Sequence, residues 1–388
     1  MRATRPCSTD PVSVESRLDC YAAWRAVECP IRLTGSPDPI DRGLVELARR
    51  FRQLAMKKEL GIFSLLVVLC MIVSILNPRF LAGANLQNMS RLIGAYGVFS
   101  IGIGIVIITG GIDLSVGSVF ALLGVLLSMM LTEWGWAAGL AVLVVVGIAM
   151  GLGFLHGLLV TRLSLQPFIV TLCGLLFYRG LARFIAKDET KGFGSAAGFE
   201  GLRDLATGSV VGIPTPFLLL VVISIVMWVV LHRSIYGRYL FAVGRNEEAA
   251  RYSGINSSRI VTGAYVISGA LAGLAAIIFA FYTNSISPSS HGNFFELYGI
   301  AAAVLGGCSL RGGEGSIIGI LIGVALLQVL QNLVNLLGVP SSLNFAVMGA
   351  VILLGVIGDQ MLKRRAARAT LVASEVESAP NPEPSPSK

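Results

Sequence analysis

Glycine and polar residues interrupt a long apolar run at residues 108–122, which read ITGGIDLSVGSVFAL. The interruption places one carboxylate, Asp113, among Gly110, Gly111 and Ser115. A charged carboxylate at the centre of a bilayer costs about 2.5–3.5 kcal/mol on insertion scales, so Asp113 needs partners. Either it caps the next apolar segment by accepting backbone N–H groups at its start, or it belongs to a gate, an intersubunit contact or the solute path itself.

Four amide side chains occupy one face of a later apolar segment. Gln328, Gln331, Asn332 and Asn335 stand at i, i+3, i+4 and i+7, a spacing that aligns side chains along an α-helix. Amides are costly to expose to lipid, so this face is expected to meet protein or water. It either lines a path for a solute with hydroxyl groups, because an uncharged amide both donates and accepts hydrogen bonds, or it joins helices, including across a dimer interface.

A polar stretch at residues 241–256, FAVGRNEEAARYSGIN, separates two apolar runs and predicts a short helix outside the membrane. Asn246 can cap this helix and Gly254 can end it. Glu247 and Glu248 suit its first turn, where the helix dipole favours negative charge. The stretch is either an ordinary solvated helix or a docking helix for a soluble partner.

Several chemistries lack the residues that they need. A nucleotide-binding P-loop requires a Gly-Lys pair, and no lysine of the chain follows a glycine; the GGEGS stretch at residues 312–316 has no lysine. The six cysteines include no C-x-x-C pair, so neither a zinc site nor a redox motif is indicated. No nucleophile–base pair is found, and no basic patch with interleaved aromatic residues points to nucleic acid. We therefore expect no catalytic residue, metal or cofactor.

The elements that must position these residues are membrane helices. Apolar residues make up 54% of the 388 residues and charged residues only 13%, about half the charged fraction of soluble domains; the mean hydropathy is +0.77. An all-α, polytopic membrane protein is predicted, because a membrane helix needs about 20 mostly apolar residues. About ten runs qualify, at residues 60–76, 92–109, 116–132, 136–160, 165–186, 215–231, 260–282, 295–307, 316–337 and 343–358. The short eighth run and the interrupted second and third are alternatively re-entrant.

The distribution of charge sets the expected orientation. Arginines cluster in the loop at residues 232–259, so the positive-inside pattern places this loop and both termini in the cytoplasm. The loop at residues 187–213 then lies outside. Arg179 and Arg183 near it are expected either to snorkel toward the interface or to meet an acidic surface of a partner protein. The expected parts are a disordered extension at 1–40, a basic amphipathic surface helix at 41–58, a transmembrane domain at 59–362 and a disordered cytoplasmic tail at 363–388.

Small residues recur four positions apart inside the apolar runs. The pairs are Gly147 and Gly151, Gly153 and Gly157, Gly269 and Gly273, and Gly319 and Gly323. Because small residues let helix backbones approach closely in lipid, we expect these pairs to pack helix on helix.

Several blocks of the sequence resemble one family of transport proteins. Residues 248–254, EAARYSG, match the E-A-A-x-x-x-G coupling loop of the membrane subunits of ATP-binding-cassette (ABC) importers, although the downstream part of that motif is not evident. YGRYLFAVGRNEEAARYSGIN and ITGGIDLSVGSVFAL look like the permease subunits of ribose-type sugar importers, as do AAAVLGGCSLRGGEGSIIGILIG and QNLVNLLGVPSSLNFAVMGAVILLGVIGD. The resemblance covers about residues 57–365; the long N-terminal extension and the Pro/Ser-rich tail depart from it.

The resemblance implies a permease that carries a monosaccharide of the pentose or hexose class across the bacterial inner membrane. It implies a periplasmic sugar-binding protein, a separate ABC ATP-binding subunit that hydrolyses ATP, and a permease homodimer in the lipid bilayer. The residues expected to couple to the ATPase are Gly244, Arg245, Asn246, Glu247, Glu248, Ala249, Ala250 and Gly254. Those expected at a gate are Gly110, Gly111, Asp113 and Ser115, and those expected along the substrate path are Gln328, Gln331, Asn332 and Asn335.

The residues alone leave two alternatives to a sugar permease open. A related branched-chain amino-acid permease would share the architecture, and the neutral amide face favours sugar over its zwitterionic cargo. An ion-coupled secondary transporter would need carboxylates within its spans, and Asp113 is the only such candidate that the sequence offers.

Overall fold

The computed structural model describes residues 58–194 and 198–338, together with positions 343, 346, 349, 350 and 353. The predicted extension at 1–40, the predicted surface helix at 41–58 apart from residue 58, and the predicted tail at 363–388 lie outside the described residues. Most of the tenth predicted run also lies outside them.

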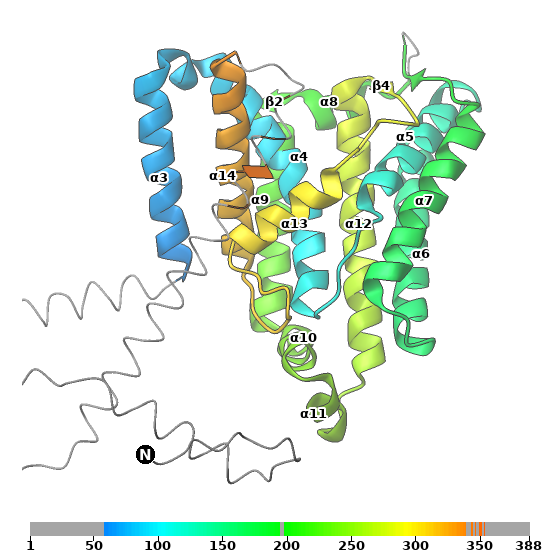
Figure 1. Ribbon diagram of the computed structural model, residues 1–388. Helices are drawn as coiled ribbons and strands as arrows, with labels where there is room; N and C mark the ends of the chain where they lie inside the picture. The colour runs from blue at the N-terminus through cyan, green and yellow to red at the C-terminus, as the bar shows by residue number, and fades with distance from the viewer. Residues whose placement is uncertain are drawn as a thin grey trace, which may run out of the picture. The chain divides into compact units, whose positions relative to one another are not determined.

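The described part of the chain is built of helices (Figure 1). Seven of them are long and apolar enough to cross a membrane: α3 (Lys58–Leu76), α4 (Gly83–Ile108), α6 (Ala138–Arg162), α7 (Pro167–Ala186), α9 (Thr215–Trp228, continued by a π-helical turn to Arg233), α12 (Ser257–Thr283) and α14 (Ile317–Leu336). Two apolar helices are shorter, α5 (Val116–Thr132) and α13 (Phe295–Leu305). The polar elements are η2 (Pro78–Leu81), α8 (Glu200–Thr207), α10 (Ile235–Arg245) and α11 (Glu247–Tyr252).

Two pairs of very short strands complete the described residues. β1 (Lys191–Gly192) pairs antiparallel with β4 (Ser285–Ile286), and β2 (Ser209–Val210) pairs with β3 (Ile213–Pro214). Figure 1 places α8, β2 and β4 at one end of the helical bundle and α10 and α11 at the other. A helical, multi-pass architecture is therefore confirmed, whereas the predicted number of about ten spans is not.

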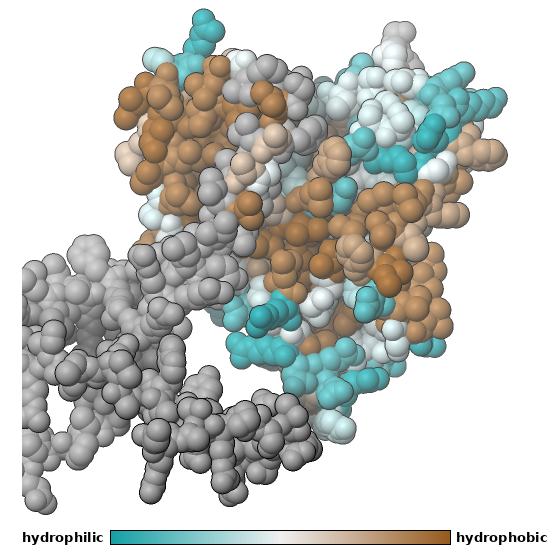
Figure 2. Space-filling view, in the orientation of Figure 1, coloured by the Kyte–Doolittle hydropathy of each residue, from teal (hydrophilic) through white to brown (hydrophobic). Residues whose placement is uncertain are grey.

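Burial identifies the helices that form the core. The most apolar window of α4 is 83% buried and that of α12 is 72% buried, whereas the corresponding window of α3 is only 6% buried. α3 packs against α14 through a small separate cluster that includes Val73, Phe80 and Val329. Figure 2 shows an apolar surface over the bundle and hydrophilic residues at the end where α10 and α11 lie, as expected for helices that meet lipid.

Glycines set the closest helix contacts, as the spacing of small residues predicts. A Cβ atom on Gly153 would overlap the Tyr265 carbonyl, and one on Gly269 would overlap the Ala149 carbonyl, so α6 and α12 touch backbone to backbone. Gly323 of α14 meets the Ala302 carbonyl of α13 in the same way. The prediction fails for the pair Gly147 and Gly151, whose missing side chains would point into open space.

Candidate functional site

The interruption between α4 and α5 is a break in the helix. The last turn of α4 is closed by Thr109, whose hydroxyl donates to the Val106 carbonyl oxygen at 2.7 Å. Gly110 then adopts a left-handed φ of +86°, a conformation that glycine reaches at no steric cost. Residues 111–115 belong to no helix and run along the bundle to the start of α5 (Figure 1). The glycines and polar residues at 110–115 therefore stop one helix and start another.

Asp113 lies inside this break and is 5% exposed. One carboxylate oxygen accepts the backbone N–H of Ser115 at 2.9 Å and the Ser115 hydroxyl at 2.6 Å. Ser115 is the residue immediately before α5, so the carboxylate satisfies a backbone donor at the start of that helix. This is the geometry that the capping interpretation expects. A role for Asp113 in a gate stays a prediction.

Other polar side chains lie within electrostatic range of Asp113. His156 of α6 and Tyr178 of α7 are joined by a hydrogen bond of 2.9 Å between Nε2 and the hydroxyl, and both lie within electrostatic range of Asp113. Tyr265 of α12 is also within that range, and its buried hydroxyl has no hydrogen-bond partner among the described residues. Because three helices contribute, movement of any one of them changes the surroundings of the Asp113 carboxylate.

Arg179 joins the start of α5 to the segment before α13. This contact was not predicted from the sequence. Its guanidinium donates to the carbonyl oxygens of His291 at 2.6 Å, Pro288 at 3.3 Å and Gly117 at 3.1 Å. Arg179 is therefore directed inward, and the expectation that it snorkels toward the interface is wrong. The reason is that three backbone acceptors are within its reach inside the bundle.

A second buried carboxylate lies at the same place. Glu296, in the first turn of α13, is 7% exposed and lies against Gly117 of α5, where an added Cβ atom would overlap its Oε2. Asp113 is therefore not the only carboxylate within the apolar helices. Glu296 was not predicted as a site residue, because a single glutamate at the edge of an apolar run forms no periodic pattern with other polar residues.

The four predicted amides have different environments. Asn332 makes a reciprocal pair with Asn85 of α4, with N–O distances of 2.7 and 3.1 Å, and Asn335 is exposed. Gln328 is 1% exposed and its Nε2 has no hydrogen-bond partner among the described residues; the buried Oε1 of Gln331 has none either. The interhelical interpretation therefore accounts for Asn332, and the free hydrogen-bonding capacity belongs to Gln328 and Gln331.

Aromatic rings gather next to this face. Tyr96 of α4 has its ring centroid 4.4 Å from that of Tyr298, 5.0 Å from Phe279 and 5.1 Å from Phe295. The Tyr298 hydroxyl lies beside the side chain of Gln328. We call this set the aromatic–amide cluster; it comprises Tyr96, Phe279, Phe295, Tyr298, Gln328 and Gln331. Aromatic rings and amide groups are the side chains that suit a solute with both apolar faces and hydroxyl groups.

The short helix predicted within residues 241–256 is present as α11. Asn246 caps it, with Oδ1 accepting the Ala249 N–H at 2.9 Å, and Gly254 ends the turn that follows with a φ of +83°. Glu247 accepts the hydroxyl of Ser257 at 2.9 Å, which ties α11 to the first residue of α12. Tyr252 at the end of α11 is 92% exposed. The remaining predicted residues, Arg245, Glu248 and Ala250, lie at the end of α10 or within α11.

Glycines connect α10, the helix that precedes α11, to the break after α4. The Gly313 N–H donates to the Ile108 carbonyl oxygen at 2.8 Å. A Cβ atom on Gly244 would overlap that same carbonyl, and one on Gly312 would lie 2.6 Å from the Gly244 carbonyl oxygen. The ends of α4 and α10 and the loop before α14 thus approach one another closely enough for their main-chain atoms to touch. We call this contact the glycine joint; it comprises Gly110, Gly244, Gly312 and Gly313.

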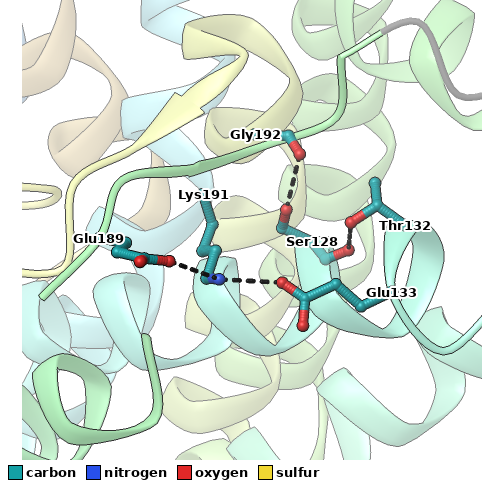
Figure 3. Close-up of polar contacts among 6 residues, drawn as sticks. All are labelled: Ser128, Thr132, Glu133, Glu189, Lys191 and Gly192. Carbon is teal, nitrogen blue, oxygen red and sulfur yellow. Dashed lines mark hydrogen bonds and ion pairs between the residues drawn. The ribbon is translucent and has the colours of Figure 1, made fainter. Parts of the chain in front are cut away.

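Polar contacts connect α5 to β1 at the opposite end of the bundle (Figure 3). Ser128 of α5 donates its hydroxyl to the Gly192 carbonyl at 2.9 Å, and Lys191 pairs with Glu133 at 2.9 Å and with Glu189 at 3.4 Å. The hydrogen bond to Glu133 raises the pKa of Lys191. Because β1 carries Lys191 and pairs with β4, these contacts connect α5 to the segment that leads into α13.

Comparison with known proteins places this arrangement among permeases. Residues 85–356 match the family described as “Branched-chain amino acid transport system / permease component”. The chain is 40% identical to the ribose import permease protein RbsC of Bacillus subtilis over 78% of this chain and 93% of that protein. It is 38% identical to RbsC of Escherichia coli (80% and 96%) and 34% identical to the fructose import permease protein FruF of Bifidobacterium longum (75% and 83%). No solved structure matches the chain.

Proposed function

Because the chain belongs to the permease family described as “Branched-chain amino acid transport system / permease component”, we propose that it is the membrane-spanning subunit of an ABC importer for a monosaccharide. The observation that carries this proposal is the 40% identity to a ribose import permease across 93% of that protein's length. A further relative is a fructose import permease, so the relatives favour a sugar over the amino acid that the family description names.

The proposed importer contains further subunits. A separate ABC ATP-binding subunit docks on α11, whose exposed Tyr252 offers a contact surface. A periplasmic binding protein delivers the sugar at the opposite end, where α8 and the paired strands lie, and two copies of the chain form the permease. The arginines of the loop at residues 232–259 support the orientation with α11 in the cytoplasm.

The proposed sugar path passes the aromatic–amide cluster. Support comes from Gln328 Nε2 and Gln331 Oε1, because buried polar atoms without partners cost free energy unless a ligand or water satisfies them. Alternating access then requires the elements around the cluster, α4, α13 and α14, to move against each other. The glycine joint links two of these elements to α10, and α10 is followed directly by α11.

Reconstitution tests the proposed function. The permease, its cognate ATP-binding subunit and its binding protein are placed in proteoliposomes, and uptake of radiolabelled pentoses, hexoses and leucine is measured with and without ATP. We expect ATP-dependent uptake of at least one monosaccharide and none of leucine. Uptake of leucine alone would favour the amino-acid permease, and uphill uptake by the permease alone on an ion gradient would establish a secondary transporter.

A further inference from the structure

A surface groove lies between α6 and α12, close to the end of the bundle that carries α10 and α11. Its volume is about 600 Å³. Its apolar wall includes Phe154 and Leu158 from α6 and Val266 and Ile267 from α12. Phe154 is 50% exposed, so the groove opens to the surroundings of the bundle, which for an apolar membrane helix are lipid acyl chains.

Two arginines stand at the polar end of this groove. Arg162 is the last residue of α6, and Arg259 is the third residue of α12. Both are exposed, and neither guanidinium has an ion pair or side-chain hydrogen bond within the part of the chain that the structure describes. Among residues 58–194 and 198–338, no acidic side chain lines the groove. The apolar groove therefore ends at two positively charged side chains that have no acidic partner among the described residues.

The position of Arg259 strengthens the case for an anion there. It lies in the first turn of α12, where the helix dipole is positive and a cation is unfavourable. A negative ligand between Arg162 and Arg259 would offset both the repulsion between the two guanidinium groups and the repulsion from the helix terminus. The hydroxyl group of Ser258, next to Arg259 in the chain, also lines the groove and can donate to an oxyanion.

We propose that this groove binds one anionic glycerophospholipid. Its phosphate lies between Arg162 and Arg259, and one acyl chain follows the apolar wall at Phe154 and Val266. An anionic phospholipid carries both a negatively charged headgroup and apolar acyl chains. Basic pockets between membrane helices are suited to such headgroups. The site lies away from the aromatic–amide cluster and from the glycine joint, and it does not depend on which solute the protein transports.

Lipid binding to the purified full-length permease tests this proposal. Native mass spectrometry in detergent measures binding of phosphatidylglycerol and of phosphatidylcholine with identical acyl chains. The variants are Arg162→Gln, Arg259→Gln and the double variant, with Arg251→Gln on α11 as the matched exposed control. Since a basic residue near an anionic lipid contributes on the order of 1 kcal/mol, we expect about fivefold weaker phosphatidylglycerol binding for each single variant and about thirtyfold for the double variant.

Further measurements distinguish a phospholipid site from a site for a soluble anion and from a protein contact. Phosphatidylcholine binding is expected to stay the same in all variants, and Arg251→Gln is expected to behave like the natural chain. Equal preference for phosphatidylglycerol in the natural chain and the double variant would overturn the proposal. Equally tight binding of sn-glycerol 3-phosphate would show a site for a soluble anion, and crosslinking of Phe154→Cys to a second copy of the chain would show a protein contact; either result would also overturn it. Melting temperatures of the variants identify any loss of folding.

Discussion

At the scale of single residues, Asp113 combines a structural contact with a position inside the bundle. Replacing it by alanine removes the acceptor for both the N–H and the hydroxyl of Ser115. Because hydrogen bonds to charged groups contribute about 1.5–3 kcal/mol, we expect a loss of stability of this size and a fall in uptake. Thermal unfolding and uptake per permease in proteoliposomes measure both effects. Ser115→Ala, which keeps the backbone bond, should have the smaller effect; equal uptake by Asp113→Ala and the natural chain would show that the carboxylate is dispensable.

The amides allow a sharper prediction, because the structure separates two that are paired or exposed from two that are not. Gln328→Met and Gln331→Met remove buried groups with unpaired atoms, so their stability should be unchanged or higher. If these groups bind the sugar, uptake should fall at least about fivefold per variant, the effect of losing a hydrogen bond of about 1 kcal/mol.

The neighbouring amides provide the control. Asn332→Met breaks the pair with Asn85 and should lower the melting temperature, whereas Asn335→Met, at an exposed position, should change neither stability nor uptake. Uptake that falls equally in all four variants would point to general damage to α14 rather than to a sugar path.

Sequence alone could locate Asp113 and the amides, because a carboxylate in an apolar run and a four-residue amide face are local signals. It could not locate Arg179 at its true position. The backbone acceptors of Arg179 lie 62 and 112 residues away, at Gly117 and His291, and carbonyl groups carry no sequence signature. Nor could hydropathy distinguish Asn332 from Gln331, because the partner of Asn332 lies on α4.

At the scale of secondary-structure elements, the glycine joint makes a direct prediction. Gly244 lies within α10, where alanine is a better helix former than glycine, so a defect in Gly244→Ala cannot arise from weaker helix formation. The added Cβ atom would overlap the Ile108 carbonyl. We expect uptake to be lost while ATP hydrolysis by the assembled importer continues, since the ends of α4 and α10 can no longer move as one.

Gly147→Ala is the matched control for this change. Its Cβ atom would enter open space on α6, so uptake should be unchanged, and stability should be unchanged or higher by up to about 1 kcal/mol. If Gly244→Ala transports as well as Gly147→Ala, close contact at the joint has no part in coupling.

Arg179 and Arg183 provide a second matched pair, one turn apart on α7. Arg179→Met removes three hydrogen bonds to carbonyl groups that join α5, α7 and the segment before α13, and we expect a loss of at least about 2 kcal/mol. Arg183 pairs with Asp188 at an exposed position, where solvent screens the ion pair, so Arg183→Met should lower stability much less than Arg179→Met. Thermal unfolding of the two variants compares them; equal losses would contradict an inward clamp at Arg179.

Hydropathy predicted the middle of each described span better than its ends. The second apolar run was expected from residue 92, but α4 begins at Gly83. The first turns of α4 are polar because their side chains have protein partners: Asn85 pairs with Asn332, and Gln87 donates to the Gly212 carbonyl. A hydropathy pattern cannot distinguish such internally paired polar residues from a loop.

At the scale of the whole molecule, the two interrupted parts of the chain meet. The first turn of α5 contacts Glu296 in the first turn of α13, and Arg179 bonds to both segments. The stretches GGIDLSVGSV and GGCSLRGGEGSI resemble each other, and the glycine joint brings glycines of both stretches, Gly110 of the first and Gly312 and Gly313 of the second, close to α10. The class of fold followed from composition, whereas this meeting of distant breaks required the three-dimensional structure.

The packing of α3 has a consequence for biosynthesis. α3 is hardly buried, and Asn77, the residue that follows it, donates a side-chain hydrogen bond to the Leu336 carbonyl, 259 residues later. At 5–20 residues per second, the ribosome needs about 13–50 s to make that partner. During this interval α3 must remain in the lipid bilayer without α14 packed against it. A chain released before α14 emerges would therefore leave its first span undocked, a defect that membrane proteases can recognise.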